Sequence, residues 1–351
     1  MKLAMFLPNW VGDAVMATPA LRAIRRQFAG AEIVGIMRPV IAEVLEGTGL
    51  VDRALLVDPR SANEILRGPR LIRQLQAERC DTAVLFTNSL RTAWWAWRSG
   101  ARRRIGFARD FRNWLLTECL EPWSRTVPNP VLDEYLRLAD VLGCDHLSRD
   151  MTLAVSQSDA ATLDSFWKQH PTMFRMRGVV CFNTGGAFGP AKNWLRESFV
   201  ELAQRIVDRL GKTVLIVCGP AERDEARWIA AAARRPNVLS LAAEPLSIGL
   251  TKAAIRNAEL LVTTDSGPRH FAAAFDVPVI TLFGPTHIAW SETYYPRSIH
   301  LQVPIDCGPC QQRECPLRHH RCMTELTVDR VFDAVRQAQT QFARQPLRAA
   351  A

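Results

Sequence analysis

Residues 260–284 read Leu-Leu-Val-Thr-Thr-Asp-Ser-Gly-Pro-Arg-His-Phe-Ala-Ala-Ala-Phe-Asp-Val-Pro-Val-Ile-Thr-Leu-Phe-Gly. An apolar run of strand length ends in small polar residues, a short Ala-rich helix opens at Pro268, and a second apolar strand follows. Strand, loop, helix and strand in this order predict a parallel α/β sheet. Such sheets bind ligands at the carboxyl ends of their strands, where a helix amino terminus offers N–H groups to phosphate. The alternative is an ordinary turn in which Asp265 or Ser266 caps the helix.

The composition is that of a soluble globular protein, and the length of the chain suggests two domains. The chain has 351 residues, of which 48% are apolar and 23% charged, and this length exceeds that of one typical core. No stretch has the roughly 20 apolar residues that a membrane-spanning helix needs. The apolar start ends at Pro8, before polar residues, so we interpret it as a first strand rather than a signal peptide. We therefore expect a cytoplasmic protein.

The net charge of +9 points to an anionic partner. Nucleic acid, a nucleotide, an acidic lipid and a phosphorylated sugar all fit this charge. Charge alone does not choose among them.

Strands and helices alternate twice along the chain. Strands are predicted at 2–8, 33–36, 54–57 and 82–86, and again at 151–155, 179–183, 213–218, 260–264 and 277–283. Helices are predicted at 14–28, 41–46, 64–76, 132–142 and 159–169, and at 197–210, 222–233 and 247–257. We expect two Rossmann-like domains with parallel sheets, residues 1–165 and 175–351, with the boundary between Ser156 and Arg177.

The loop from Thr184 to Lys192 follows a strand and contains three glycines. Glycines let backbone N–H groups approach an anion, and a lysine adds a positive charge. The loop matches neither a Walker A motif nor a dinucleotide fingerprint. We interpret it as a phosphate site, and the alternative is a long connection.

Two carboxylates follow other strands. Glu222 follows the predicted strand at 213–218, at a position where an acid commonly binds ribose hydroxyls. An acid at the start of a helix is the alternative interpretation. Together these loops suit a nucleotide diphosphate. Asp13 lies in a predicted loop after the first strand, where it is either a general base or a helix cap.

Tryptophan and arginine are concentrated between Arg91 and Trp114. One interpretation is a helix with a core Trp face and a solvated Arg face, followed by a strand. The other is a surface for a phosphorylated amphiphile or a membrane. Its candidate residues are Trp94, Arg98, Arg102, Arg103 and Arg104.

Four of the nine cysteines lie close together, at Cys307, Cys310, Cys315 and Cys322, with His319 and His320 between them. These residue types could form a tetrahedral metal site, although the spacing is not that of a standard zinc finger. Disulfides and free thiols are the alternatives. We assign no metal ligand from the sequence.

Several motifs occur together in one order: Asn9-Trp-Val-Gly-Asp-Ala-Val-Met, Thr18-Pro-Ala-Leu-Arg-Ala-Ile, Lys192-Asn-Trp, Asp265-Ser-Gly-Pro-Arg-His and Phe283-Gly-Pro-Thr. With them the chain resembles, over almost its whole length, the ADP-heptose:lipopolysaccharide heptosyltransferases of glycosyltransferase family 9. The first motif is most similar to the heptosyltransferase II form. The resemblance implies a GT-B fold, two Rossmann-like domains facing a cleft, with a final helix that commonly returns to the first domain. It also implies an inverting reaction without a cofactor or a catalytic metal.

The resemblance also implies roles for individual residues. Asp13 would deprotonate the acceptor hydroxyl, and Lys192 would neutralise the diphosphate leaving group and help hold the donor sugar. The other donor contacts follow from the same resemblance. The phosphates would be contacted by Thr184, Gly185, Gly186, Ser266 and Gly267. Glu222 would contact the ribose, Leu246 the adenine, Asp265 the heptose hydroxyls, and His270 the sugar–phosphate region. Ser266 stands where related enzymes often have threonine, and the loop at Thr184 matches the family less closely.

The expected function is transfer of heptose from ADP-heptose to the lipid A-linked inner core of lipopolysaccharide. We expect a monomer in transient contact with the inner face of the cytoplasmic membrane, without a nucleic-acid partner. One alternative is a family 9 transferase with another acceptor or nucleotide sugar. A second is a non-catalytic protein that binds a nucleotide sugar or nucleic acid.

Overall fold

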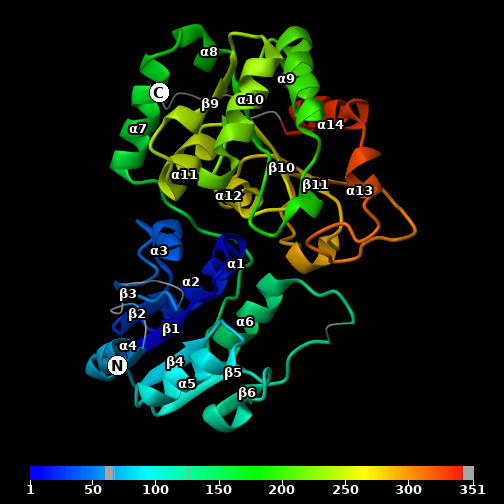
Figure 1. The fold of residues 1–351 in the computed structure, drawn as a ribbon. Helices are drawn as coiled ribbons and strands as arrows, with labels where there is room; N and C mark the ends of the chain where they lie inside the picture. Colours follow the sequence, from blue (N-terminus) through cyan, green and yellow to red (C-terminus); the bar gives the residue numbers. More distant parts are fainter. Residues whose placement is uncertain (60–65, 67, 125, 343–351) are drawn as a thin grey trace. The chain divides into compact units, whose positions relative to one another are not determined.

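Two six-stranded parallel sheets form the protein, each in its own part of the chain (Figure 1). The computed structural model describes residues 1–59, 66, 68–124 and 126–342. The first compact unit contains Met1–Ala154 and Ala289–Tyr294, and the second contains Val155–Ile288 and the chain from Tyr295 on. Helices α7 (Gln157–Lys168) and α8 (Thr172–Met176) lie in the boundary region predicted from the sequence, and they belong to the second unit.

The first sheet has the strand order β3-β2-β1-β4-β5-β6. Its strands are β1 (Lys2–Phe6), β2 (Glu32–Met37), β3 (Arg53–Leu56), β4 (Thr82–Leu85), β5 (Arg103–Phe107) and β6 (Glu118–Leu120). The helices of this unit are α1 (Val11–Met16), α2 (Thr18–Gln27), α3 (Pro39–Leu45), α4 (Gly68–Glu78), α5 (Leu90–Arg98), η2 (Asn113–Leu115) and α6 (Val131–Val141).

The second sheet has the order β12-β11-β10-β7-β8-β9. Its strands are β7 (Val179–Asn183), β8 (Thr213–Val217), β9 (Val238–Ser240), β10 (Leu260–Thr264), β11 (Val279–Phe283) and β12 (Ser298–Gln302). Its α-helices are α7 (Gln157–Lys168), α8 (Thr172–Met176), α9 (Arg196–Leu210), α10 (Arg223–Ala233), α11 (Ile248–Arg256), α12 (Pro268–Ala274), α13 (Arg321–Thr324) and α14 (Val328–Gln341). The short turns are η3 (Pro190–Lys192), η4 (Pro220–Glu222), η5 (Leu241–Ala243) and η6 (Ile288–Ser291).

Both sheets have the strand order of a Rossmann fold. In each sheet, successive strands are added first on one side of the first strand and then on its other side. The reversal lies between β1 and β4 in one sheet and between β7 and β10 in the other. Alternate residues of a strand face opposite sides of a sheet. Ala4 and Phe6 therefore pack with Leu71 and Trp95 of α4 and α5. Both faces of each sheet are covered, as the continuous apolar runs in the sequence predict.

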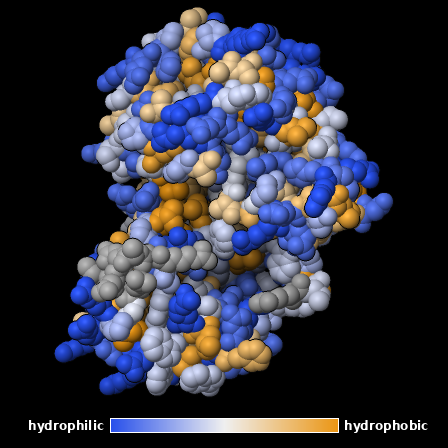
Figure 2. All heavy atoms as spheres, in the orientation of Figure 1, coloured by the Kyte–Doolittle hydropathy of each residue, from blue (hydrophilic) through white to orange (hydrophobic). Residues whose placement is uncertain are grey.

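The final helix packs inside the second unit, against α9 and beside β11 and β12. A return of the chain end to the first domain stays a prediction. Figure 2 shows mainly hydrophilic side chains on the visible surface, with smaller apolar patches between them.

Two sequence predictions of local structure are wrong. Residues 151–155 form no strand, because the N–H of Thr152 donates to Oγ1 of Thr18 on α2 (2.9 Å) rather than to a neighbouring strand. The helix predicted at 14–28 is two helices. The first begins earlier, at Val11, and the second starts at Thr18 with Pro19 in its first turn. Of the helix predicted at 64–76, residues 64, 65 and 67 lie outside the described residues.

Candidate functional site

The carboxyl ends of β7 and β10 meet where the second sheet reverses its strand order. Register pairs Asn183, the last residue of β7, with Thr263 of β10. The predicted phosphate loop follows β7 and the Asp265 loop follows β10, so parallel pairing brings the two loops together. The sequence prediction that these loops share one sheet edge is confirmed.

The Asn183 side chain connects the two loops. Its Nδ2 lies 2.9 Å from the carbonyl of Gly185, 3.0 Å from Oγ1 of Thr263 and 2.9 Å from Oγ of Ser266. A buried amide with several partners restricts the positions of all of them. Sequence reasoning missed Asn183. A polar residue at the end of an apolar strand could have indicated it as a site residue.

The Asp265 carboxylate lies at the centre of the cluster. It accepts hydrogen bonds from Nζ of Lys192 (2.7 Å) and from Oγ1 of Thr286 (2.7 Å), and Nη1 of Arg269 lies 3.6 Å away. Burial by itself raises the pKa of Asp265, but the charges of Lys192 and Arg269 and these hydrogen bonds lower it to about 2. Asp265 is therefore ionised at neutral pH.

Lys192 is held by both the side chain and the backbone of Asp265. Its Nζ also donates to the Asp265 carbonyl (2.9 Å), and the ammonium lies 4.3 Å from the centre of the Phe188 ring. Lys192 is the last residue of the short turn η3. It is buried, although lysine is usually exposed. An ammonium has three donors, so one more can reach a ligand oxygen.

The glycines predicted to bind phosphate are tightly packed. A Cβ at Gly186 would lie 2.8 Å from Cβ of Ser266, and one at Gly185 would lie 2.7 Å from Cγ of Glu222. Oγ1 of Thr184 is buried and has no hydrogen-bond partner within the part of the chain that the structure describes. A buried hydroxyl of this kind is what a bound anion or water would satisfy. Gly267 is the residue immediately before α12.

Glu222 and Leu246 lie at the edge of the cluster. The Glu222 carboxylate accepts a hydrogen bond from the N–H of Gly219 (3.1 Å), where it caps the turn η4. The helix-start interpretation of Glu222 is therefore observed, and its side chain also lies against Gly185. Leu246 is half-buried and packs on the core of the second unit.

His270 and Arg269 occupy the first turn of α12 and are both buried. Burial, together with the charge of Arg269, lowers the pKa of His270 well below its usual value. His270 is therefore neutral at pH 7. Nη2 of Arg269 lies 3.0 Å from Nε2 of His300, on β12. Sequence reasoning placed Arg269 and Thr286 in motifs without giving them a role, and it missed His300.

In the first unit, Asp13 lies in the first turn of α1 and not in the predicted loop. It is half-buried, and the helix cap position is occupied by Trp10. Burial raises the pKa of Tyr135 well above its usual value, and the negative charges of Asp13 and Glu134 raise it further. The charge of Asp13 thus acts on the hydroxyl of Tyr135. Asp13 lies at the amino end of a helix, where the dipole favours a carboxylate.

The same unit has a pocket at the carboxyl edge of its sheet. It is lined by residues that follow β1 and β4, among them Asn9, Thr87, Ser89, Arg91 and Thr92. Sequence reasoning did not select these residues. The pocket lies at the strand reversal of this sheet, where α/β proteins bind ligands.

The aromatic and basic segment divides into exposed and structural side chains. Trp94 and Trp97 of α5 are 41% and 46% exposed, whereas Trp95 is buried. The guanidinium of Arg98 lies over both exposed rings, at 5.9 Å and 6.0 Å from their centres. The helix followed by a strand that the sequence suggested is observed as α5 and β5.

The basic side chains of this segment differ in their surroundings. Arg103 forms an ion pair with Glu118 of β6, and Arg104 donates to the carbonyls of Leu115 and Ala101. Arg112 is fully buried, where burial lowers its pKa to about 10. Of the predicted basic residues, Arg98 and Arg102 are exposed. The segment is therefore partly structural.

Comparison with known proteins identifies the family. Residues 69–321 match the model of glycosyltransferase family 9 (heptosyltransferase), which is most of the chain. The chain belongs to glycosyltransferase family 9. It is thus a glycosyltransferase of the heptosyltransferase family, as its motifs predicted.

Relatives of this family 9 chain include heptosyltransferases of the second type. It is 23% identical to lipooligosaccharide heptosyltransferase 2 of Campylobacter jejuni, over 97% of this chain and 100% of the relative. It is 24% identical to lipopolysaccharide heptosyltransferase 2 of Escherichia coli, over 95% of this chain and 97% of the relative.

The fold agrees with solved structures of the family. The structure of Escherichia coli ADP-heptose lipopolysaccharide heptosyltransferase II matches with a TM-score of 0.80 and 22% identity, over 97% of this chain and 99% of that chain. The predicted GT-B fold class is confirmed. Among residues 1–59, 66, 68–124 and 126–342, no helix is long and apolar enough to cross a membrane.

Proposed function

We propose that this family 9 glycosyltransferase transfers L-glycero-D-manno-heptose from ADP-heptose to the heptosyl-Kdo2-lipid A inner core of lipopolysaccharide, with inversion at the anomeric carbon. The observation that supports the proposal is the buried Lys192–Asp265 ion pair, which lies beside β7 and β10, where the second sheet reverses its strand order. The chain that contains this pair belongs to the heptosyltransferase family. The names of two relatives support ADP-heptose as the donor and lipopolysaccharide as the class of acceptor.

The donor diphosphate would bind at the loops that follow β7 and β10. Backbone N–H groups at Gly185, Gly186 and Gly267 and the hydroxyls of Thr184 and Ser266 would contact phosphate. The Lys192 ammonium, fixed by Asp265, would use its remaining donor on a phosphate oxygen. Its charge would stabilise the ADP that leaves as the bond to the anomeric carbon breaks.

The sugar and the nucleoside would extend from this phosphate site. Asp265 would accept from heptose hydroxyls, and neutral His270 would hydrogen-bond near the sugar–phosphate link. Glu222 would take the ribose, and Leu246 would contact adenine. Because Glu222 already caps η4, binding ribose requires its second carboxylate oxygen.

Asp13 would act as the general base. It would take the proton of the acceptor hydroxyl while that oxygen forms its bond to the anomeric carbon from the face opposite ADP. The pocket lined by Asn9, Ser89 and Arg91 suits the anionic acceptor, since it contains a cation and hydroxyls. The proposal places the enzyme at the inner face of the cytoplasmic membrane, where a lipid-linked acceptor is accessible.

The test is turnover of ADP-heptose with a truncated acceptor that carries one heptose, measured by ADP release and by mass spectrometry of the glycolipid. Asp13→Asn is expected to lower kcat by at least about 10²-fold, as for loss of a general base, with an unchanged melting temperature. The matched control is Asp145→Asn, an exposed acid of the same unit, and this variant should keep full activity.

Other outcomes would replace parts of the proposal. Turnover with a different nucleotide sugar would contradict the donor assignment. Salt-sensitive binding of nucleic acid without any turnover would favour a binding protein, and this binding would survive Asp13→Asn. The anomeric configuration of the product, measured by NMR, tests inversion.

A further inference from the structure

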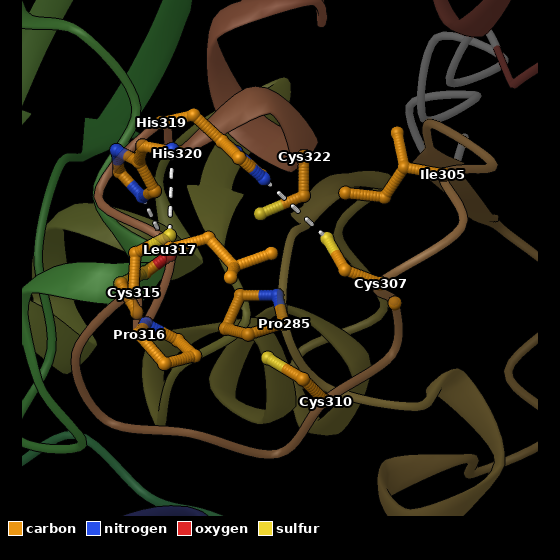
Figure 3. Close-up of a pocket in the computed structure, with 12 residues that line it drawn as sticks. Pro285, Ile305, Cys307, Cys310, Cys315, Pro316, Leu317, His319, His320 and Cys322 are labelled. Carbon is orange, nitrogen blue, oxygen red and sulfur yellow. Dashed lines mark hydrogen bonds between the residues drawn. The ribbon is translucent and has the colours of Figure 1, made fainter.

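The second unit has a pocket that the proposed reaction does not use. It is formed by the cysteine loop, which we define as residues 307–322. Figure 3 shows the side chains of its four cysteines on the pocket wall, together with His319 and Leu317. Three residues outside the loop complete the wall: Pro285, Ile305 and Ala191, which precedes Lys192.

The spacing of the four cysteines suits tetrahedral thiolate coordination. Cys307 and Cys310 form a C-x2-C pair, and Cys315 and Cys322 follow at intervals of four and six residues. Structural zinc sites commonly combine such a pair with ligands supplied from a second segment. All four residues are thiols in this structure.

The backbone near Cys315 supplies a hydrogen-bond donor to its sulfur. The N–H of His320 donates to Sγ of Cys315 (3.4 Å), which brings the start of α13 over this sulfur. Hydrogen bonds of this kind orient the ligands of metal sites.

His319 and His320 support the loop rather than complete the ligand set. Nδ1 of His319 accepts from the N–H of Arg321 (3.1 Å), so a neutral ring carries its hydrogen on Nε2, which lies 3.8 Å from Sγ of Cys307. His319 thus donates to a cysteine sulfur, as outer partners of metal sites do. Nε2 of His320 lies 2.8 Å from the carbonyl of Ala191.

In the described residues, no three His, Cys, Asp or Glu side chains are grouped closely enough to hold a metal ion as they stand. A cation is needed to bring thiolates together, because their charges otherwise repel one another. Ligation at about 2.3 Å per Zn–S bond therefore requires the sulfur atoms on the pocket wall to move inward. Rotation about Cα–Cβ bonds between staggered positions contributes such movement.

The cysteine loop also holds the turn that carries Lys192. Besides the His320 contact, the N–H of Ala191 donates to the carbonyl of Arg313 (3.0 Å). Gly189 has a φ of 150°, and a Cβ there would lie 2.6 Å from the same carbonyl. Both backbone groups of Ala191 are thus bonded to the loop, so its order determines where η3 and Lys192 lie.

We propose that the four cysteine thiolates of this loop bind one divalent transition-metal ion with a preference for sulfur, such as Zn²⁺ or Fe²⁺. The ion has a structural role and takes no part in the transfer. It releases the thiol protons on binding and fixes the loop against Ala191. The consequence for Lys192 rests on the proposed function, whereas the metal site does not.

The experiment measures zinc and iron by plasma mass spectrometry in protein purified with a reductant, before and after refilling with Zn²⁺ alone. We expect about one ion per chain. Cys315→Ser should lower this content at least about tenfold. Cys119→Ser changes an exposed cysteine of the first unit, outside the pocket, and should keep it. His319→Ala should weaken metal affinity about 10- to 100-fold.

A spectroscopic measurement on the unmodified protein covers the case in which Cys315→Ser does not fold. Protein refilled with Co²⁺ should show the thiolate charge-transfer bands and the strong visible bands of tetrahedral Co²⁺. Absence of metal after refilling, absence of these bands, or a disulfide among the four cysteines in freshly purified protein would each overturn the proposal. Metal binding without transferase activity would leave this inference standing and contradict the proposed function.

Discussion

Nζ of Lys192 lies 2.7 Å from Oδ2 of Asp265, although 73 residues separate them in the chain. Both residues are buried, at 9% and 7% exposure. Removing one member of a buried pair leaves a charge without its partner, which costs far more than loss of an exposed pair. This relationship links the loops that follow β7 and β10 and gives both candidate site residues a structural role.

The first prediction concerns this pair. Lys192→Met and Asp265→Asn should each lower the free energy of unfolding by about 3 kcal/mol. The double variant should lose less than the sum of the two, by at least about 1 kcal/mol. Urea unfolding measures all three values.

An exposed pair with the same separation supplies the control for this cycle. Nζ of Lys212 lies 2.7 Å from Oε2 of Glu259 at the surface, and Lys212→Met should cost about 0.5 kcal/mol. If the two lysine variants lose the same stability, the Lys192–Asp265 pair is not the buried interaction described.

The second prediction concerns acid stability. The folded pKa of Asp265 is about 2, below its ordinary value of 3.8, so the unfolded chain takes up this proton first. The stabilisation from the ionised carboxylate is complete above about pH 5 and is lost as the pH falls from about 5 toward 2, by about 2 kcal/mol. Asp265→Asn should remove this part of the pH dependence.

Unfolding free energies between pH 5 and pH 3 test this, since the slope for the unmodified protein should exceed that for Asp265→Asn. Asp208→Asn, at an exposed ion pair with Arg235, should keep most of the original slope. Equal slopes for the unmodified protein and Asp265→Asn would show that Asp265 titrates in its ordinary range.

The third prediction concerns close packing at the phosphate loop. Gly186→Ala puts a methyl group 2.8 Å from Cβ of Ser266, so the two loops must separate. We expect at least about tenfold weaker binding of ADP, because a small displacement misaligns backbone donors. Calorimetric titration of ADP measures it.

Gly30→Ala is the matched control, since a Cβ at Gly30 meets no atom within 4 Å. This variant should bind ADP like the unmodified protein. Normal ADP affinity in Gly186→Ala would place the phosphates elsewhere.

The fourth prediction concerns membrane contact. Trp94 and Trp97 are exposed beside Arg98, a combination typical of a membrane interface. The double variant Trp94→Ala with Trp97→Ala should lower binding to vesicles that contain anionic phospholipid by at least about threefold. Cosedimentation at low and high salt measures it.

Trp228→Ala is the control for this experiment. Trp228 is an exposed tryptophan of the second unit with the guanidinium of Arg196 4.1 Å from its ring centre. If both changes reduce vesicle binding equally, exposed tryptophan acts non-specifically and α5 is not the contact surface.

The parallel sheets, β7, β10 and α12 could be predicted from the sequence because buried strands appear as continuous apolar runs bounded by turn residues. The start of α1 could not, because its first residues, Trp10 to Gly12, include no side chain that caps a helix. The absence of a strand at residues 151–155 also depends on Thr18, which is distant in sequence and supplies the hydrogen bond.

The sequence by itself determined the family, the two tandem Rossmann-like halves and the loops that carry the candidate donor site, because these depend on local periodicity and on motifs in order. Only the tertiary structure decided that Asn183 connects both loops, that Asp265 is buried between cations, and that Arg103 and Arg104 are used structurally. Hydrogen bonds and ion pairs between side chains depend on which strands become neighbours. That neighbourhood is set by packing over many residues, and a local pattern does not contain it.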